Sequence, residues 1–131
     1  MIRDDKQLDV RERSVELSTG LYSLASQFPG PERSGLTSQV RSAATSIAAD
    51  IGEGWGRGSS GKYIPSLSVA QGSLMKLETH LIVAGHLCFL KPNESGAVAR
   101  PVRDIEKMQN HLIAVLRKRR TTGRTLAGRT L

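Results

Sequence analysis

The chain has 131 residues, 19 lysines and arginines against 12 aspartates and glutamates, and one cysteine. This length fits one domain with its own hydrophobic core, and a lone Cys88 excludes a disulfide within the chain and is typical of a reducing compartment. The longest apolar run, residues 81–90, is too short to cross a bilayer. We therefore expect a cytoplasmic protein that does not contact a membrane.

The positive charge is concentrated at the C-terminal end. The formal net charge is +7, but residues 117–131 contain six arginines and lysines and no acid, which leaves residues 1–116 at +1. Such a segment binds phosphate backbones without regard to sequence and in a salt-sensitive way. It also improves solubility or complements a helix dipole. The charge thus indicates a basic tail and not a basic domain.

Apolar residues in the first half of the chain recur at helical spacing. The first segment ends at the proline-rich residues 29–31, and its predicted apolar face consists of Val10, Leu17, Leu21, Leu24 and Phe28. The second segment runs from about Leu36 to Trp55 and ends at the glycine-rich residues 56–61. Its predicted apolar face consists of Val40, Ala44, Ile47 and Ile51.

The second half of the chain predicts two further helices. In the third segment, apolar residues alternate in steps of three and four from Tyr63 to Cys88, a pattern that favours left-handed helix packing. Pro65 is expected in its first turn. In the fourth segment Pro101 is expected near the start, and the apolar face consists of Val98, Val102, Ile105, Met108, Leu112, Ile113 and Leu116.

Four amphipathic helices with short connections predict an all-α fold, an antiparallel up-down-up-down four-helix bundle. We assign residues 1–119 to the bundle. Residues 120–131 show no apolar periodicity and are expected to form a basic, disordered tail.

The second helix has a further face that is unusual for solvent. Opposite its apolar face lies a stripe of small residues, namely Ser38, Ser42, Thr45, Ala49 and Gly52. Exposed helix faces normally carry lysine and glutamate, and small residues let another helix approach closely. We expect a second subunit to cover this face, with Glu53 and Glu78 as carboxylates at the interface. The alternatives are close packing within one bundle and plain solvation of the serines.

None of the sequence patterns that suggest a nucleotide, metal or catalytic site is complete. Residues 56–62 match two phosphate-loop strings, but these require a preceding strand, and Tyr63 stands where serine or threonine would bind magnesium. His80 and His86 are six residues apart and do not share a helix face as metal ligands would. We therefore expect no cofactor, no metal and no catalytic residue, and predict that the protein is not an enzyme.

Three blocks of sequence resemble one known family. Residues 35–44 (GLTSQVRSAA), residues 50–59 (DIGEGWGRGS) and the run from Gly72 to Thr79 are similar to blocks of the bacterial four-helix-bundle proteins called 23S rRNA intervening-sequence proteins. The resemblance covers about residues 6–119. Asp50 departs from the asparagine that is usual in the family.

The resemblance implies a symmetric ring of five identical subunits. Relatives include the accessory variability determinant of diversity-generating retroelements, a basic pentamer that binds nucleic acid and a reverse transcriptase. By this likeness Arg41, Arg57 and Lys62 are candidate charged positions of the ring. The tail adds the candidates Arg117, Lys118, Arg119 and Arg120 for binding RNA or DNA.

The leading interpretation is a non-enzymatic oligomer that binds nucleic acid weakly or serves as a scaffold for a nucleic-acid enzyme such as a reverse transcriptase. The alternative is a pure protein-interaction scaffold without a nucleic-acid role. A third, weaker hypothesis places an enzyme in a central pore built from repeated copies of Glu53 or Glu78.

Overall fold

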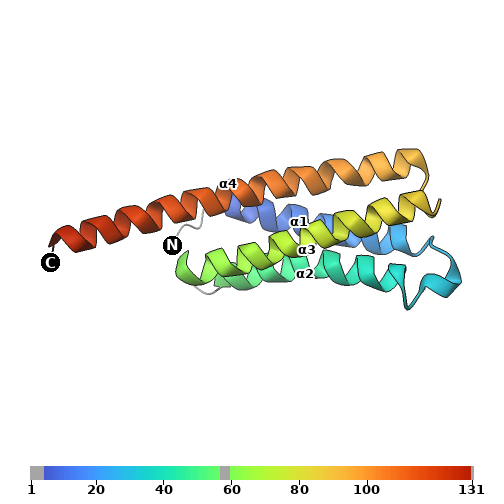
Figure 1. The fold of residues 1–131 in the computed structure, drawn as a ribbon, viewed down its shortest axis with the longest axis horizontal. Helices are drawn as coiled ribbons and strands as arrows, with labels where there is room; N and C mark the ends of the chain where they lie inside the picture. The colour runs from blue at the N-terminus through green and yellow to red at the C-terminus, as the bar shows by residue number, and fades with distance from the viewer. Residues whose placement is uncertain (1–4, 57–59, 131) are drawn as a thin grey trace.

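The computed structural model describes residues 5–56 and 60–130, with side chains other than those of residues 5–7, 55–56, 60–62 and 119–130. Within these ranges all regular structure is helical (Figure 1). The elements are α1 (Asp5–Ala25), the short 3-10 helix η1 (Gly30–Glu32), α2 (Leu36–Gly56), α3 (Ser60–His86) and α4 (Pro92–Thr130). The predicted all-α class and the extent of the second helix are confirmed, whereas α1 ends at Ala25, so that Phe28, predicted on its apolar face, follows the helix.

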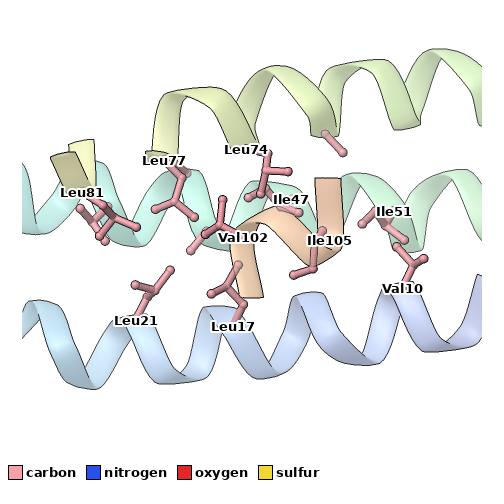
Figure 2. Close-up of a cluster of buried hydrophobic side chains, with 14 of the residues drawn as sticks. Val10, Leu17, Leu21, Ile47, Ile51, Leu74, Leu77, Leu81, Val102 and Ile105 are labelled. Atoms are coloured by element: carbon pink, nitrogen blue, oxygen red, sulfur yellow. The ribbon is translucent and has the colours of Figure 1, made fainter. Parts of the chain in front are cut away.

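The four α-helices pack side by side into a bundle. α2 contacts α1 and α3, α3 contacts α4, and α4 closes the bundle against α1. The predicted apolar faces point into the shared core, as Figure 2 shows for Leu17 and Leu21 of α1, Ile47 of α2, Leu77 of α3 and Ile105 of α4. Burial of these stripes is the main driving force for the fold. No helix in the described ranges is both long and apolar enough to cross a membrane.

Particular contacts show which parts of neighbouring helices meet. Arg41, early in α2, donates a hydrogen bond from Nη2 to the Tyr22 carbonyl, late in α1, at 3.0 Å. Gln71 of α3 donates from Nε2 to the side-chain oxygen of Asn110 of α4. The rings of Phe28 and Phe89, which follow α1 and α3, lie with their centroids 5.7 Å apart. The C-terminal ends of α1 and α3 therefore lie at the same end of the bundle.

The C-terminal end of α3 differs from the prediction. Cys88 was expected on the apolar face of the helix, but α3 ends at His86 and Cys88 is exposed. The Phe89 N–H donates to the Ala84 carbonyl at 2.9 Å and the Cys88 N–H to the Gly85 carbonyl at 3.1 Å. This pair of bonds defines a Schellman cap, in which Cys88 takes the left-handed position with φ 61°. The cap hydrogen bonds decide the helix end here, and the side-chain periodicity does not.

We expect Cys88→Gly to raise the free energy of unfolding by about 1 kcal/mol, because a side chain in the left-handed region is strained and glycine is not. Thermal unfolding followed by circular dichroism would measure the gain. Cys88→Ala is the matched control, since it removes the thiol but keeps the strain and should leave the stability almost unchanged. Equal stabilisation by both variants would mean that the backbone conformation is not the cause.

The beginnings of α3 and α4 also differ from the prediction. α4 begins at Pro92, and the Lys91 N–H donates to Glu94 Oε1 at 2.9 Å, as in one half of a capping box. Pro101 therefore lies inside α4 and not near its start. Pro65 likewise lies inside α3, since that helix begins at Ser60. Both helices start earlier than their apolar stripes do, and in α4 the cap made by Glu94, not the core residues, fixes the first turn.

The last residues of the chain were expected to be disordered, whereas α4 continues as a helix to Thr130. Figure 1 shows this helix running well past the other three. After Leu116 the sequence contains no proline, and its glycines, Gly123 and Gly128, are isolated. An isolated glycine costs a helix only about 1 kcal/mol, and extending a formed helix avoids the unfavourable nucleation step.

Candidate oligomer interface

The small-residue face of α2 lies on the outside of the bundle. Ser38, Ser42, Thr45 and Ala49 are exposed, and Gly52 is half-buried. The face is therefore not used for packing within one chain, which removes that alternative interpretation. Two interpretations of this α2 face remain, namely that a second subunit covers it or that solvent does.

The hydroxyl groups on this face do not all point to solvent. Thr45 Oγ1 donates within its own helix, to the carbonyls of Arg41 at 2.9 Å and Ser42 at 3.1 Å. The hydroxyl hydrogen of Thr45 is therefore satisfied without water, and only the lone pairs of its oxygen remain to accept a hydrogen bond. The centre of the α2 face is therefore less polar than its residue types suggest.

An apolar edge of α1 lies next to the α2 face. Leu8, Val15 and Tyr22 are spaced by seven residues and are 42%, 49% and 45% exposed. Two contacts join this edge to α2. The Arg41 guanidinium lies 4.9 Å from the centre of the Tyr22 ring, and Arg11 Nε lies 3.7 Å from the place where a side chain on Gly52 would begin. The α1 edge and the α2 face thus form one continuous surface, which we call the α1–α2 face.

Sequence reasoning missed the α1 contribution to this face. The signal was present, because Leu8, Val15 and Tyr22 repeat every seven residues on the side opposite Leu17. It was overlooked because isolated exposed apolar residues are common and are informative only as a patch.

The two predicted interface carboxylates lie on different parts of the bundle. Glu53 is exposed near the end of α2, beside the small-residue face. Glu78 lines a groove between α3 and α4 together with Val102 and Arg103. Glu78 is therefore not part of the α1–α2 face.

Asp50 is a half-buried carboxyl group one turn before Glu53. Burial, and to a lesser degree the negative charge of Glu53, raise the pKa of Asp50 above its ordinary value of 3.8. Because the folded state binds this proton more tightly than the unfolded state does, ionising Asp50 destabilises the fold. This destabilisation is absent at a pH below the ordinary pKa of Asp50, and it develops as the pH rises through the higher pKa that Asp50 has in the folded state.

We therefore expect Asp50→Asn to be more stable than the wild type at pH 7, with the difference vanishing toward pH 3. Denaturation curves at several pH values would measure it. Glu53→Gln, which removes the lesser cause, should give a smaller gain at pH 7 and lower the Asp50 pKa. A constant difference between wild type and Asp50→Asn at all pH values would contradict the proposed origin.

The candidate nucleic-acid residues fall into two groups. Arg41 is half-buried and held against Tyr22, so its guanidinium joins α1 to α2. Arg117 and Lys118 of α4 are exposed and directly follow the buried Leu116. Arg119, Arg120 and Lys62 belong to described helices, but their side chains, and Arg57 as a whole, lie outside the described residues.

The described residues offer no site for a metal. Among them, no group of three His, Cys, Asp or Glu side chains is placed to hold an ion. The phosphate-loop strings at residues 56–62 follow a helix, α2, where such loops need a strand. Residues 57–59 of that segment lie outside the described ranges.

The architecture is that of a known bundle fold. It is similar to the crystal structure of a protein of unknown function from the S23 ribosomal protein family of Bacteroides thetaiotaomicron, with a TM-score of 0.78 and 19% identity over 83% of this chain and 98% of that chain. A comparison with curated proteins gave no match. The family model for the 23S rRNA-intervening sequence protein matches residues 6–111, and the chain therefore belongs to this family.

Proposed function

We propose that the protein is a non-enzymatic, ring-forming homo-oligomer that binds RNA or DNA, acting alone or as an accessory scaffold for a nucleic-acid enzyme. The observation that carries the proposal is the exposed α1–α2 face, where three large apolar side chains border a helix surface of small residues. Exposed apolar side chains that gather on one face, beside a helix surface that lets a partner approach closely, are typical of an interaction site.

An antiparallel up-down arrangement of the helices is part of the proposal. It is supported by the pairing of the start of α2 with the end of α1 through Arg41 and Tyr22, and by the ring contact of Phe28 with Phe89. A bundle of this kind presents two different helix pairs on its opposite sides. A contact between unlike faces of neighbouring subunits generates rings when the rotation closes. The number five and a reverse-transcriptase partner rest on the family resemblance alone, and the cytoplasmic location rests on the lone Cys88 and the short apolar runs of the sequence.

The basic end of α4 supports the nucleic-acid part of the proposal. Arg117 and Lys118 are exposed, and the segment 117–131 contains six cations and no acid. In a ring, each subunit contributes one such segment, and linked weak sites bind a polyanion far more tightly than one site does. Assembly would therefore provide the affinity that a bundle body of charge +1 lacks.

Light scattering of purified Ala49→Arg tests the assembly. The wild type is expected at a multiple of its 14.2 kDa chain mass, and the variant as a monomer, because an arginine in the middle of the small-residue surface blocks close approach. Ala114→Arg, an identical change on an exposed position of α4, should keep the wild-type mass. A monomeric wild type, or an unchanged mass for Ala49→Arg, would overturn the ring.

Fluorescence anisotropy with labelled RNA and DNA tests the nucleic-acid role. We expect binding at low salt that weakens steeply at moderate salt and that Arg117→Gln together with Lys118→Gln reduces. Absence of binding at low salt would favour the second candidate, a pure protein-interaction scaffold. A specific observation supports that candidate as well, namely a groove between α1 and α4 that is lined by five carboxylates and two arginines, although the whole chain is positively charged.

A further inference from the structure

A long groove runs between α1 and α4. It has a volume of about 950 Å³ and is lined by residues 9–24 of α1 and residues 94–105 of α4. Its floor is apolar and includes Leu17, Leu21 and Val98, while Gly20, Gly96 and Ala97 keep it open. Small residues at these places allow the backbone of another helix to approach closely. The groove thus has the shape and lining of a site for a helical segment.

The charge of the groove is opposite to that of the chain. Five carboxylates line it, and they are Asp9, Glu12, Glu16, Glu94 and Asp104. Two arginines oppose them, and one of these, Arg13, is paired with Asp9 at 3.3 Å. On a protein of net charge +7 this is a region of excess negative charge. It repels phosphate backbones and attracts a cationic segment.

We propose that this groove binds the basic C-terminal segment of α4, residues 117–130, from a second copy of the chain. The segment has the complementary charge, with six cations and no acid, and it is helical to Thr130. The lengths also agree. Residues 117–130 span about 20 Å as a helix, and residues 9–24 of α1 offer a track of about 22 Å.

The segment of the same chain does not reach its own groove. α4 is one helix from Pro92 to Thr130, so Arg124 lies about 36 Å along the axis from Arg100, which lines the groove. Figure 1 shows the end of α4 projecting away from the other helices. Only a second copy can bring this segment into the groove without breaking α4. The contact competes with nucleic acid for the same cations, and it is separate from the α1–α2 face.

A labelled peptide with the sequence of residues 115–131 tests this inference against the full-length chain with its own six tail cations replaced by glutamine, so that no native tail competes for the groove. At low salt we expect the peptide to bind with a rise in anisotropy, and a peptide with its six cations replaced by glutamine not to bind. Glu16→Lys in the groove should weaken binding at least about tenfold, and Glu12→Lys combined with it should weaken binding further. Glu106→Lys changes the net charge by the same amount outside the groove and should leave binding within about twofold of the wild type.

Two results would overturn the inference. The first is no peptide binding at low salt. The second is equal weakening by Glu16→Lys and Glu106→Lys, which would show attraction to the overall charge and not to the groove. Neither result bears on the ring, because peptide binding is measured with one groove at a time, and the ring is tested by the mass of Ala49→Arg. Loss of the ring with peptide binding intact would likewise leave the groove contact standing.

Discussion

Gly54→Ala is expected to lower the free energy of unfolding by about 2 kcal/mol, because a methyl group at this position overpacks the contact between α2 and α3. A methyl group at this position would lie 2.6 Å from Tyr63 Cδ1 and 3.0 Å from Ser66 Cβ. Tyr63 is fully buried, so its ring cannot swing away without disturbing the core. Overpacking of this severity costs about 3 kcal/mol, and the better helix propensity of alanine returns about 1 kcal/mol.

Urea denaturation at a fixed protein concentration would measure this loss, since oligomers gain apparent stability with concentration. Gly20→Ala is the matched control. It makes the same change in the exposed middle of α1, where no atom lies within 4 Å of the new methyl group, and it should stabilise the chain slightly. If Gly54→Ala proves as stable as Gly20→Ala, α2 and α3 do not approach each other as closely as described.

Gln109→Met is expected to raise the free energy of unfolding by about 2 kcal/mol. Gln109 is fully buried between Ile105 and Leu112 of α4, and neither its amide nitrogen nor its amide oxygen has a hydrogen-bond partner among the described residues. A buried polar group without a partner costs about 1–3 kcal/mol. Methionine has a similar length and shape without that cost, so the fold should gain.

Gln71→Met provides the comparison. Gln71 is only half-buried, and its amide donates to Asn110 of α4. The same substitution there removes a hydrogen bond and should give no gain, or a small loss. Both variants can be compared with the wild type in one set of urea titrations. Destabilisation by Gln109→Met would indicate that the amide is bound to a partner that the isolated chain does not provide.

The position of Gln109 could have been predicted from the sequence. Val102, Ile105, Leu112 and Leu116 step by threes and fours when residue 109 is included, which places Gln109 on the buried face. The spacing of its apolar neighbours identifies this face as buried, and only the polar side chain of Gln109 argues against a buried position. The four helices were predictable for the same reason, because a regular apolar stripe determines which side of a helix is buried.

The helix ends and the groove were not predictable in this way. Cys88 occupies the left-handed cap position in which glycine is usual, so the sequence contains no glycine to mark the end of α3. The groove depends on how far α1 and α4 stand apart, and Glu16 and Asp104 face it from helices that are far apart in sequence. No periodicity within one helix reports that distance. The exposed face of α2 was predictable, because the lack of lysine along one stripe is a local property.

α4 is 39 residues long, a rod of about 58 Å, and it separates the two signs of charge along its length. Asp104 lies in its first half, and Arg124 lies about 30 Å further on, several times the screening length of about 8 Å at physiological salt. The negative potential around the groove and the positive potential around the C-terminal end of α4 therefore do not cancel, and the molecule is bipolar. A net charge of +7 would predict that copies repel one another and stay soluble. A bipolar rod instead attracts its copies end to side, so its solubility should improve when salt is added.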